Sequence, residues 1–113
     1  MTYSFFDPNM ISPKGWLRDQ LMVQAAGLSG NLDKMWPDVR DSAWIGGDRE
    51  GWERVPYWLD GFIPLAYLLE DSDMIARADR YINAILDRQQ EDGWICPCAK
   101  ESVRRTTCGQ CSL

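Results

Sequence analysis

The segment at residues 56–70 constrains the fold most, because it is apolar on nearly every side of the helix that it predicts. Pro56 favours a helix start, since proline suits the first helical position. Gly61 and Pro64 weaken or kink the helix. A helix without a polar face must be surrounded by protein on most sides. Its apolar side chains are Tyr57, Trp58, Leu59, Phe62, Ile63, Leu65, Ala66, Tyr67, Leu68 and Leu69.

Two other segments predict helices with a single apolar face. The first begins at a start signal, Ser12 and Pro13, and is stopped by residues 27–30; its apolar stripe is Leu17, Leu21, Ala25 and Leu28. Residues 72–88 carry a second stripe, made of Ile75, Ala78, Ile82, Ile85 and Leu86. The apolar residues of 31–54 show no sustained periodicity, so we interpret this segment as a long loop with room for a turn or two of helix. No strand pattern is present, so we expect an all-α fold with about three helices.

The three helix types together predict an inner helix backed by outer ones. Three helices are too few to enclose the apolar one, so side chains such as Phe62, Ile63, Tyr67 and Leu68 should stay partly uncovered. We therefore expect either self-association of the chain or a place in a larger helical assembly.

Composition excludes several functions. The chain has 113 residues, enough for one domain or a piece of one. Its net charge of −5 argues against a nucleic-acid partner, which requires a basic face. Histidine is absent, so no imidazole serves as acid, base or metal ligand. No secretory signal and no apolar run of the ~20 residues that cross a bilayer is visible. We therefore expect a soluble, cytoplasmic chain without a membrane partner.

Five blocks of sequence resemble one family of glycoside hydrolases. The most specific block is WIGGDREGWERVPYWLDG at residues 44–61. The others lie at residues 13–17, 27–33, 64–69 and 89–94. In order and spacing, these blocks resemble the family that contains the β-L-arabinofuranosidases, over roughly residues 12–98.

The resemblance implies a fold and an activity. Members of this family form (α/α)6 toroids and hydrolyse β-L-arabinofuranosides with a zinc-bound cysteine nucleophile and a glutamate acid/base. Those catalytic residues lie beyond the positions matched here, so the resemblance assigns this chain no catalytic residue, metal ligand or cofactor of its own. We expect residues 1–12 to be a lead-in and residues 13–98 to be the N-terminal part of a truncated toroid. Zinc and a carbohydrate substrate are implied for the full-length enzyme.

Trp44, Glu53, Tyr57 and Asp60 are the candidate substrate-binding residues. Sugars stack their C–H faces on aromatic rings and direct hydroxyls to carboxylates. Core packing is the competing interpretation for Tyr57 and its neighbour Trp58. Glu53 is also placed to favour a helix N-terminus. A catalytic carboxylate pair made by Glu53 and Asp60 is the least favoured interpretation.

The last fifteen residues differ from the rest. Residues 1–98 carry a net charge of −7 and residues 99–113 carry +2. Cys96, Cys98, Cys108 and Cys111 fit a four-thiolate zinc site, and with the apolar helix they suggest a small interaction or zinc-binding module as the alternative function. A shifted reading frame near residue 106 explains more features of this tail than a zinc site does, because it accounts for both the cysteines and the loss of helical periodicity. Codons for Asp-Val-Trp-Ala-Val-Leu, read one nucleotide late, give Thr-Cys-Gly-Gln-Cys-Ser, the order of residues 107–112.

Overall fold

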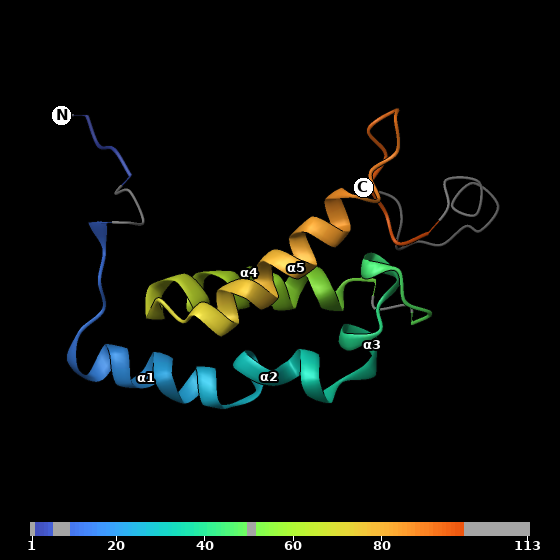
Figure 1. Ribbon diagram of the computed structural model, residues 1–113. Coiled ribbons are helices and arrows are strands. Elements are labelled where there is room, and N and C mark those ends of the chain that lie inside the picture. The colour runs from blue at the N-terminus through green and yellow to red at the C-terminus, as the bar shows by residue number, and fades with distance from the viewer. Residues whose placement is uncertain (1, 6–9, 50–51, 99–113) are drawn as a thin grey trace.

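The computed structural model describes residues 2–5, 10–49 and 52–98 (Figure 1). Its elements in chain order are α1 (Gly15–Ala26), α2 (Leu28–Met35), α3 (Pro37–Arg40), a 3-10 turn η2 (Ala43–Ile45), α4 (Arg54–Leu69) and α5 (Ser72–Leu86). Within these residues there is no strand, only an isolated bridge between Ser42 and Arg49. The all-α class expected from the sequence is therefore confirmed. The cysteine-rich tail at residues 99–113 lies outside the described residues.

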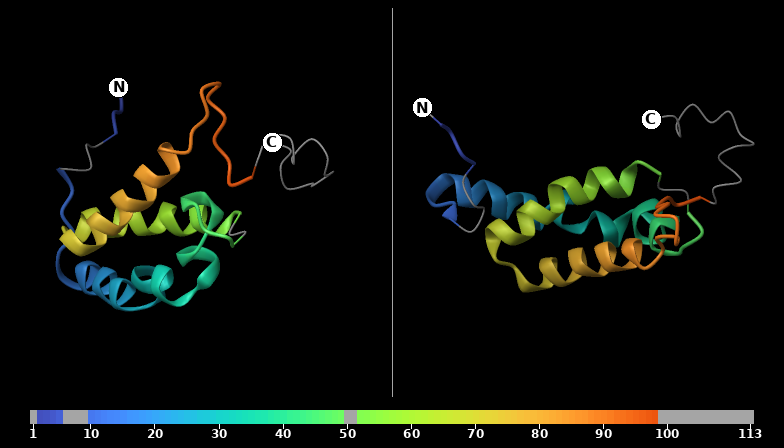
Figure 2. Two further views of the ribbon diagram at one scale, coloured as in Figure 1. Left: turned by 45° about the vertical axis from the view of Figure 1, so that its right-hand side comes forward. Right: turned by 90° about the horizontal axis from the view of Figure 1, so that it is seen from above.

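α4 is the inner helix of the described fold. It contacts each of the other four α-helices, whereas α1 and α2 form one layer and α5 packs on another side (Figures 1 and 2). The apolar side chains of α4 explain this position, because they can be buried against several neighbours at once. The expectation of an inner helix backed by outer ones holds for the described residues.

α4 and α5 form a hairpin through a tight connection. Glu70 ends α4 in the left-handed conformation, with φ 54°. Asp71 then caps α5, because its carboxylate accepts a hydrogen bond from the backbone N–H of Met74 at 2.9 Å. The two helices therefore run in opposite directions, and α5 rises away from α4 toward its own C-terminal end (Figure 1).

The prediction of a long loop over residues 31–54 was wrong in its first part. α2 and α3 occupy much of it, and only Gly27 separates the end of α1 from the start of α2. The side-chain amide of Asn31 donates to the carbonyls of Ala25, Ala26 and Gly27 at 3.1, 3.1 and 2.9 Å, which satisfies the end of α1. The polar and glycine residues that suggested a loop thus form the junction between α1 and α2.

The start of the first helix also differs from the prediction. Gly15, not Pro13, is the first residue of α1, and Lys14 is the N-cap. Gly15 adopts φ 57°, which turns the chain into the helix, while Pro13 is buried before it. The Ser12-Pro13 signal therefore marks the approach to α1 and does not cap it.

An aromatic cluster forms the centre of the core. Trp58 stacks on Phe62 with ring centroids 4.4 Å apart and meets Tyr81 of α5 edge-on at 5.0 Å. Trp58 donates its indole N–H to the carbonyl of Ser29 at 2.9 Å, which ties α4 to α2. The expected core position of Trp58 is confirmed. Phe62 is only 1% exposed, so the expectation that it stays uncovered was wrong; Arg77 of α5 lies over its ring.

One side of α4 remains open. Tyr57 is 75% exposed, so the interpretation that it packs in the core was wrong. Tyr67 is 54% exposed, which confirms the expectation that it stays partly uncovered. Ile63 and Leu68 are partly covered. Among the described helices, none combines the length and apolar character that crossing a bilayer requires.

Candidate functional site

The loop at residues 41–49 folds back on itself ahead of α4. The amide of Arg49 donates to the carbonyl of Asp41 at 3.0 Å, and the amide of Ala43 donates to the carbonyl of Arg49 at 2.7 Å. Ser42 is fully buried inside the loop, and its carbonyl accepts from Gly47 at 2.9 Å. These bonds satisfy the backbone locally and give the loop a defined shape.

Both glycines of the loop are required by its geometry. Gly46 adopts φ 88°, and a Cβ there would collide with the guanidinium of Arg88. A Cβ on Gly47 would collide with the backbone of Asp41. Arg88 follows α5, so this contact joins the block at residues 44–61 to the end of the α4–α5 hairpin.

Trp44 is held inside this loop. Its indole N–H donates to the carbonyl of Trp52 at 2.7 Å, and the two rings lie tilted with centroids 6.2 Å apart. The side chain is half-buried and its polar edge is already occupied. Trp44 therefore shapes the loop and leaves only part of its ring for contact with a ligand.

Glu53, Tyr57 and Asp60 share one exposed face of α4. Their spacing of four and three residues places them in one row on a helix, and all three are exposed. Glu53 stands at the N-cap position, but its side chain makes no capping hydrogen bond. Glu53 therefore lies at the N-terminus of α4, where a negative charge is favourable, although its carboxylate does not cap the helix.

Arg54 anchors the start of α4. Its guanidinium bonds the carboxylate of Asp38 in α3 at 3.0 Å and lies 5.1 Å from the ring centre of Trp36. These contacts fix the orientation of the first turn, and with it the direction in which the exposed face points. Arg54 thus acts as a support for the face formed by Glu53, Tyr57 and Asp60.

The spacing of Glu53 and Asp60 does not suit a catalytic pair. Seven residues advance a helix by about 10 Å along its axis. Glycosidase carboxylates act across roughly 5 to 9.5 Å on opposite sides of the scissile bond. Two carboxylates pointing from one helix face can bind the hydroxyls of one ligand, but they do not flank a bond from both sides.

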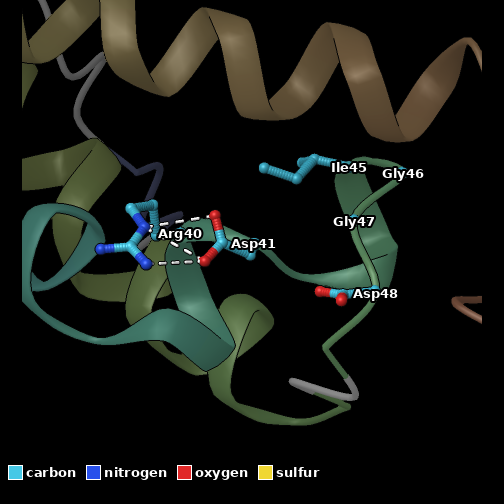
Figure 3. Close-up of a pocket in the computed structure, with 6 residues that line it drawn as sticks. All are labelled: Arg40, Asp41, Ile45, Gly46, Gly47 and Asp48. Atoms are coloured by element: carbon cyan, nitrogen blue, oxygen red, sulfur yellow. Dashed lines mark hydrogen bonds and ion pairs between the residues drawn. The ribbon is translucent and has the colours of Figure 1, made fainter.

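A hollow lies beside the loop at residues 41–49, and no pattern in the sequence predicts it. It measures about 520 Å³ and is lined by Arg40, Asp41, Ile45, Gly46, Gly47 and Asp48 (Figure 3). Arg40 donates to Asp41, at 2.8 Å for the closest pair of atoms; this bond lowers the pKa of Asp41 and raises that of Arg40. Both side chains are well exposed, so this pair contributes little to stability. Asp48 is the one other charged group of the lining.

No metal centre is found in the described part of the chain, where no three potential ligands of the Cys, Asp or Glu type gather. Cys96 and Cys98 lie close to each other, with their sulfur atoms 3.3 Å apart. Cys108 and Cys111, the other half of the zinc site considered from the sequence, lie outside the described residues.

Comparisons with protein-family models, with curated proteins and with solved structures found no match to this chain.

Proposed function

We propose that this chain is the N-terminal part of the catalytic domain of a glycoside hydrolase similar to the β-L-arabinofuranosidases. In this proposal the open face of α4, formed by Glu53, Tyr57 and Asp60, lines the sugar-binding cleft. The observation that carries it is the position of that face. α4 contacts each of the other described α-helices, and yet leaves an aromatic ring and two carboxylates uncovered in one row.

The chemistry of this row suits a sugar. The ring of Tyr57 offers an apolar surface for the C–H groups of a furanose, and its hydroxyl offers a hydrogen bond. Glu53 and Asp60 present acceptors for sugar hydroxyls on either side of that ring. The loop at residues 41–49 lies at the same end of the molecule as Glu53 (Figure 1). It supplies Asp48 as a further exposed acceptor.

The proposed role of the row is substrate binding, and bond cleavage is assigned elsewhere. Hydrolysis of a glycoside needs an acid for the leaving oxygen and a nucleophile or base opposite it. In the proposal these come from the remainder of the toroid, where the resemblance places the cysteine nucleophile, its zinc and the glutamate acid/base. Zinc bound there would lower the pKa of that cysteine and keep it as the thiolate.

The test compares two polypeptides with an aryl β-L-arabinofuranoside. One is the 113-residue chain; the other continues beyond residue 105 in the alternative reading frame, through the downstream coding sequence. We expect no turnover by the first and zinc-dependent turnover by the second. A downstream sequence with no open frame, an inactive extended protein, or turnover by the 113-residue chain would each contradict the proposal.

A specific observation also favours a second candidate, an interaction module. α1 contains no buried residue, and Trp16 and Val23, seven positions apart on one face, are 76% and 66% exposed. Exposed apolar surface of this kind is typical of contact between proteins. In this alternative the chain acts by association alone, and the extended protein would show no sugar hydrolysis.

A further inference from the structure

The two cysteines on either side of Pro97 are unexplained by the proposed function. Cys96 and Cys98 are both half-buried thiols, and their sulfur atoms are 3.3 Å apart. They lie in the segment at residues 94–98, which follows the turn that ends the α4–α5 hairpin. That turn is closed by hydrogen bonds from Gly93 to Gln90 at 2.8 Å and from Gln90 to Trp94 at 2.9 Å.

The local backbone holds these two sulfur atoms together. In an extended strand, side chains two residues apart lie on the same face, about 6.6 Å from each other, and the bend of the chain at Pro97 and Cys98 shortens that separation. Proline fixes its own φ, so the bend has little freedom to open. A disulfide bond measures about 2.05 Å, so the sulfurs need to approach by only about 1.2 Å to become bonded.

We propose that Cys96 and Cys98 form a reversible disulfide by exchange with a low-molecular-weight disulfide such as glutathione disulfide. One cysteine thiolate attacks a sulfur of glutathione disulfide, whose S–S bond breaks as a mixed disulfide forms and one glutathione leaves. The second cysteine, as its thiolate, attacks the cysteine sulfur of the mixed disulfide and expels the second glutathione. Two protein thiols are oxidised to one disulfide, and the two glutathione thiolates take up the two released protons.

The disulfide would close a small ring, which indicates a bond that is readily reduced and contributes little to the stability of the fold. A disulfide stabilises a fold mainly by closing a long loop in the unfolded chain, and only one residue separates these two cysteines. Strained disulfides have the higher reduction potentials and are the ones that exchange readily. We therefore expect the pair to follow the glutathione redox ratio while the helices stay folded.

The experiment equilibrates the 113-residue chain with mixtures of reduced and oxidised glutathione. Thiols are then trapped with N-ethylmaleimide, and tryptic peptides are weighed by mass spectrometry. Cleavage after Arg88 and Lys100 releases a peptide that holds only Cys96 and Cys98, whereas Cys108 and Cys111 fall in the peptide at residues 106–113. As the oxidised share rises, the 89–100 peptide should lose both maleimide adducts and two mass units, and dithiothreitol should restore them.

A matched variant separates pair formation from simple thiol reactivity. Cys98→Ser removes the resolving sulfur, so Cys96 should accumulate bound glutathione, which the unmodified chain should not retain. The circular dichroism of the helices should be equal in both redox states. The proposal is overturned if the 89–100 peptide keeps both maleimide adducts in the most oxidising mixture. It is equally overturned if that peptide retains glutathione in the unmodified chain, or becomes linked to the 106–113 peptide.

Discussion

Gly47 and Gly61 occupy opposite environments, and alanine at each position should have opposite effects. A Cβ on Gly47 collides with the backbone of Asp41, which cannot move without opening the loop. A Cβ on Gly61, in the middle of α4, meets no atom within 4 Å. Gly47→Ala should therefore lower the free energy of unfolding by about 1–3 kcal/mol. Gly61→Ala should raise it by about 0.5–1 kcal/mol, since alanine favours the helix.

Urea unfolding at low protein concentration, followed by helical circular dichroism, measures this difference. Because the two substitutions are chemically identical, the composition of the variants is the same and each serves as the control for the other. Equal shifts of the two unfolding midpoints would show that the loop at residues 41–49 is not packed as described.

Tyr81 should make stability depend on alkaline pH. It is fully buried, and its hydroxyl donates to the carbonyl of Val39 at 2.9 Å. Burial raises the pKa of Tyr81, and the negative charge of Asp33 raises this pKa further. The folded chain thus holds the phenolic proton more tightly than the unfolded chain. This contribution to stability is complete below pH of about 10 and is lost as the pH rises through the raised pKa.

Tyr81→Phe isolates this contribution. At neutral pH the variant should lose about 1–3 kcal/mol of stability, because the buried carbonyl of Val39 loses its partner. Above pH 10 its stability should fall less steeply than that of the unmodified chain. The check is a series of urea titrations at increasing pH, and parallel pH profiles for the two proteins would contradict the assignment.

At the scale of elements, one arginine links α2 to α5. Arg77 of α5 bonds the carboxylate of Asp33 in α2 at 2.8 Å, the carbonyl of Gly30 at 2.9 Å and the carboxylate of Asp73 at 3.0 Å. The Asp33 side chain is 3% exposed and that of Asp73 is 73% exposed. The same guanidinium therefore has one buried and one solvated carboxylate partner.

Alanine at the two aspartates should separate the buried ion pair from the solvated one. Asp33→Ala should cost about 3–5 kcal/mol, because it leaves the mostly buried guanidinium without its inner partner. Asp73→Ala should cost below about 1 kcal/mol. Thermal unfolding of the two variants tests this, and equal melting temperatures would show that α2 is not fixed to α5 through Arg77.

The helices whose apolar residues recur at helical spacing could be predicted from the sequence. The junctions between the helices could not. α4 and α5 follow from their apolar residues, and the common face of Glu53, Tyr57 and Asp60 follows from helix spacing alone. α2 was missed because Gly30 and Asn31 suggest a break. In the fold Gly30 allows the backbone of Ala25 to approach, and Asn31 caps α1. Such roles depend on neighbours that the sequence does not place.

The site shows the same division. The indole N–H of Trp44 donates to the carbonyl of Trp52 because of the way the loop at residues 41–49 closes. No local sequence pattern encodes that closure. The exposure of Tyr57 depends on which sides of α4 the other helices cover. Helix spacing in the sequence therefore predicted that Glu53, Tyr57 and Asp60 share one face, but it did not predict which residues surround that face.

For the whole molecule, the exposed apolar side chains of α1 and α4 predict self-association. Trp16 and Val23 of α1 and Tyr57 of α4 lie largely in solvent, and apolar patches of this kind favour contact between chains. Sedimentation velocity should show oligomers whose share grows with concentration. Trp16→Ser with Val23→Ser should reduce that share without lowering stability, because neither side chain is buried. A monodisperse monomer that binds no ANS would contradict this prediction.

The most direct test of the account is whether the open face of α4 contacts the sugar. In the extended protein with the alternative reading frame, Tyr57→Ala and Asp60→Asn should each raise KM for the aryl β-L-arabinofuranoside by about three- to tenfold, the effect of losing about 0.7–1.4 kcal/mol of binding. Asp79→Asn, the same change at an exposed carboxylate of α5, is the control and should leave KM unchanged. If Tyr57→Ala and Asp60→Asn both leave kcat and KM equal to those of the control, the open face of α4 does not bind the substrate.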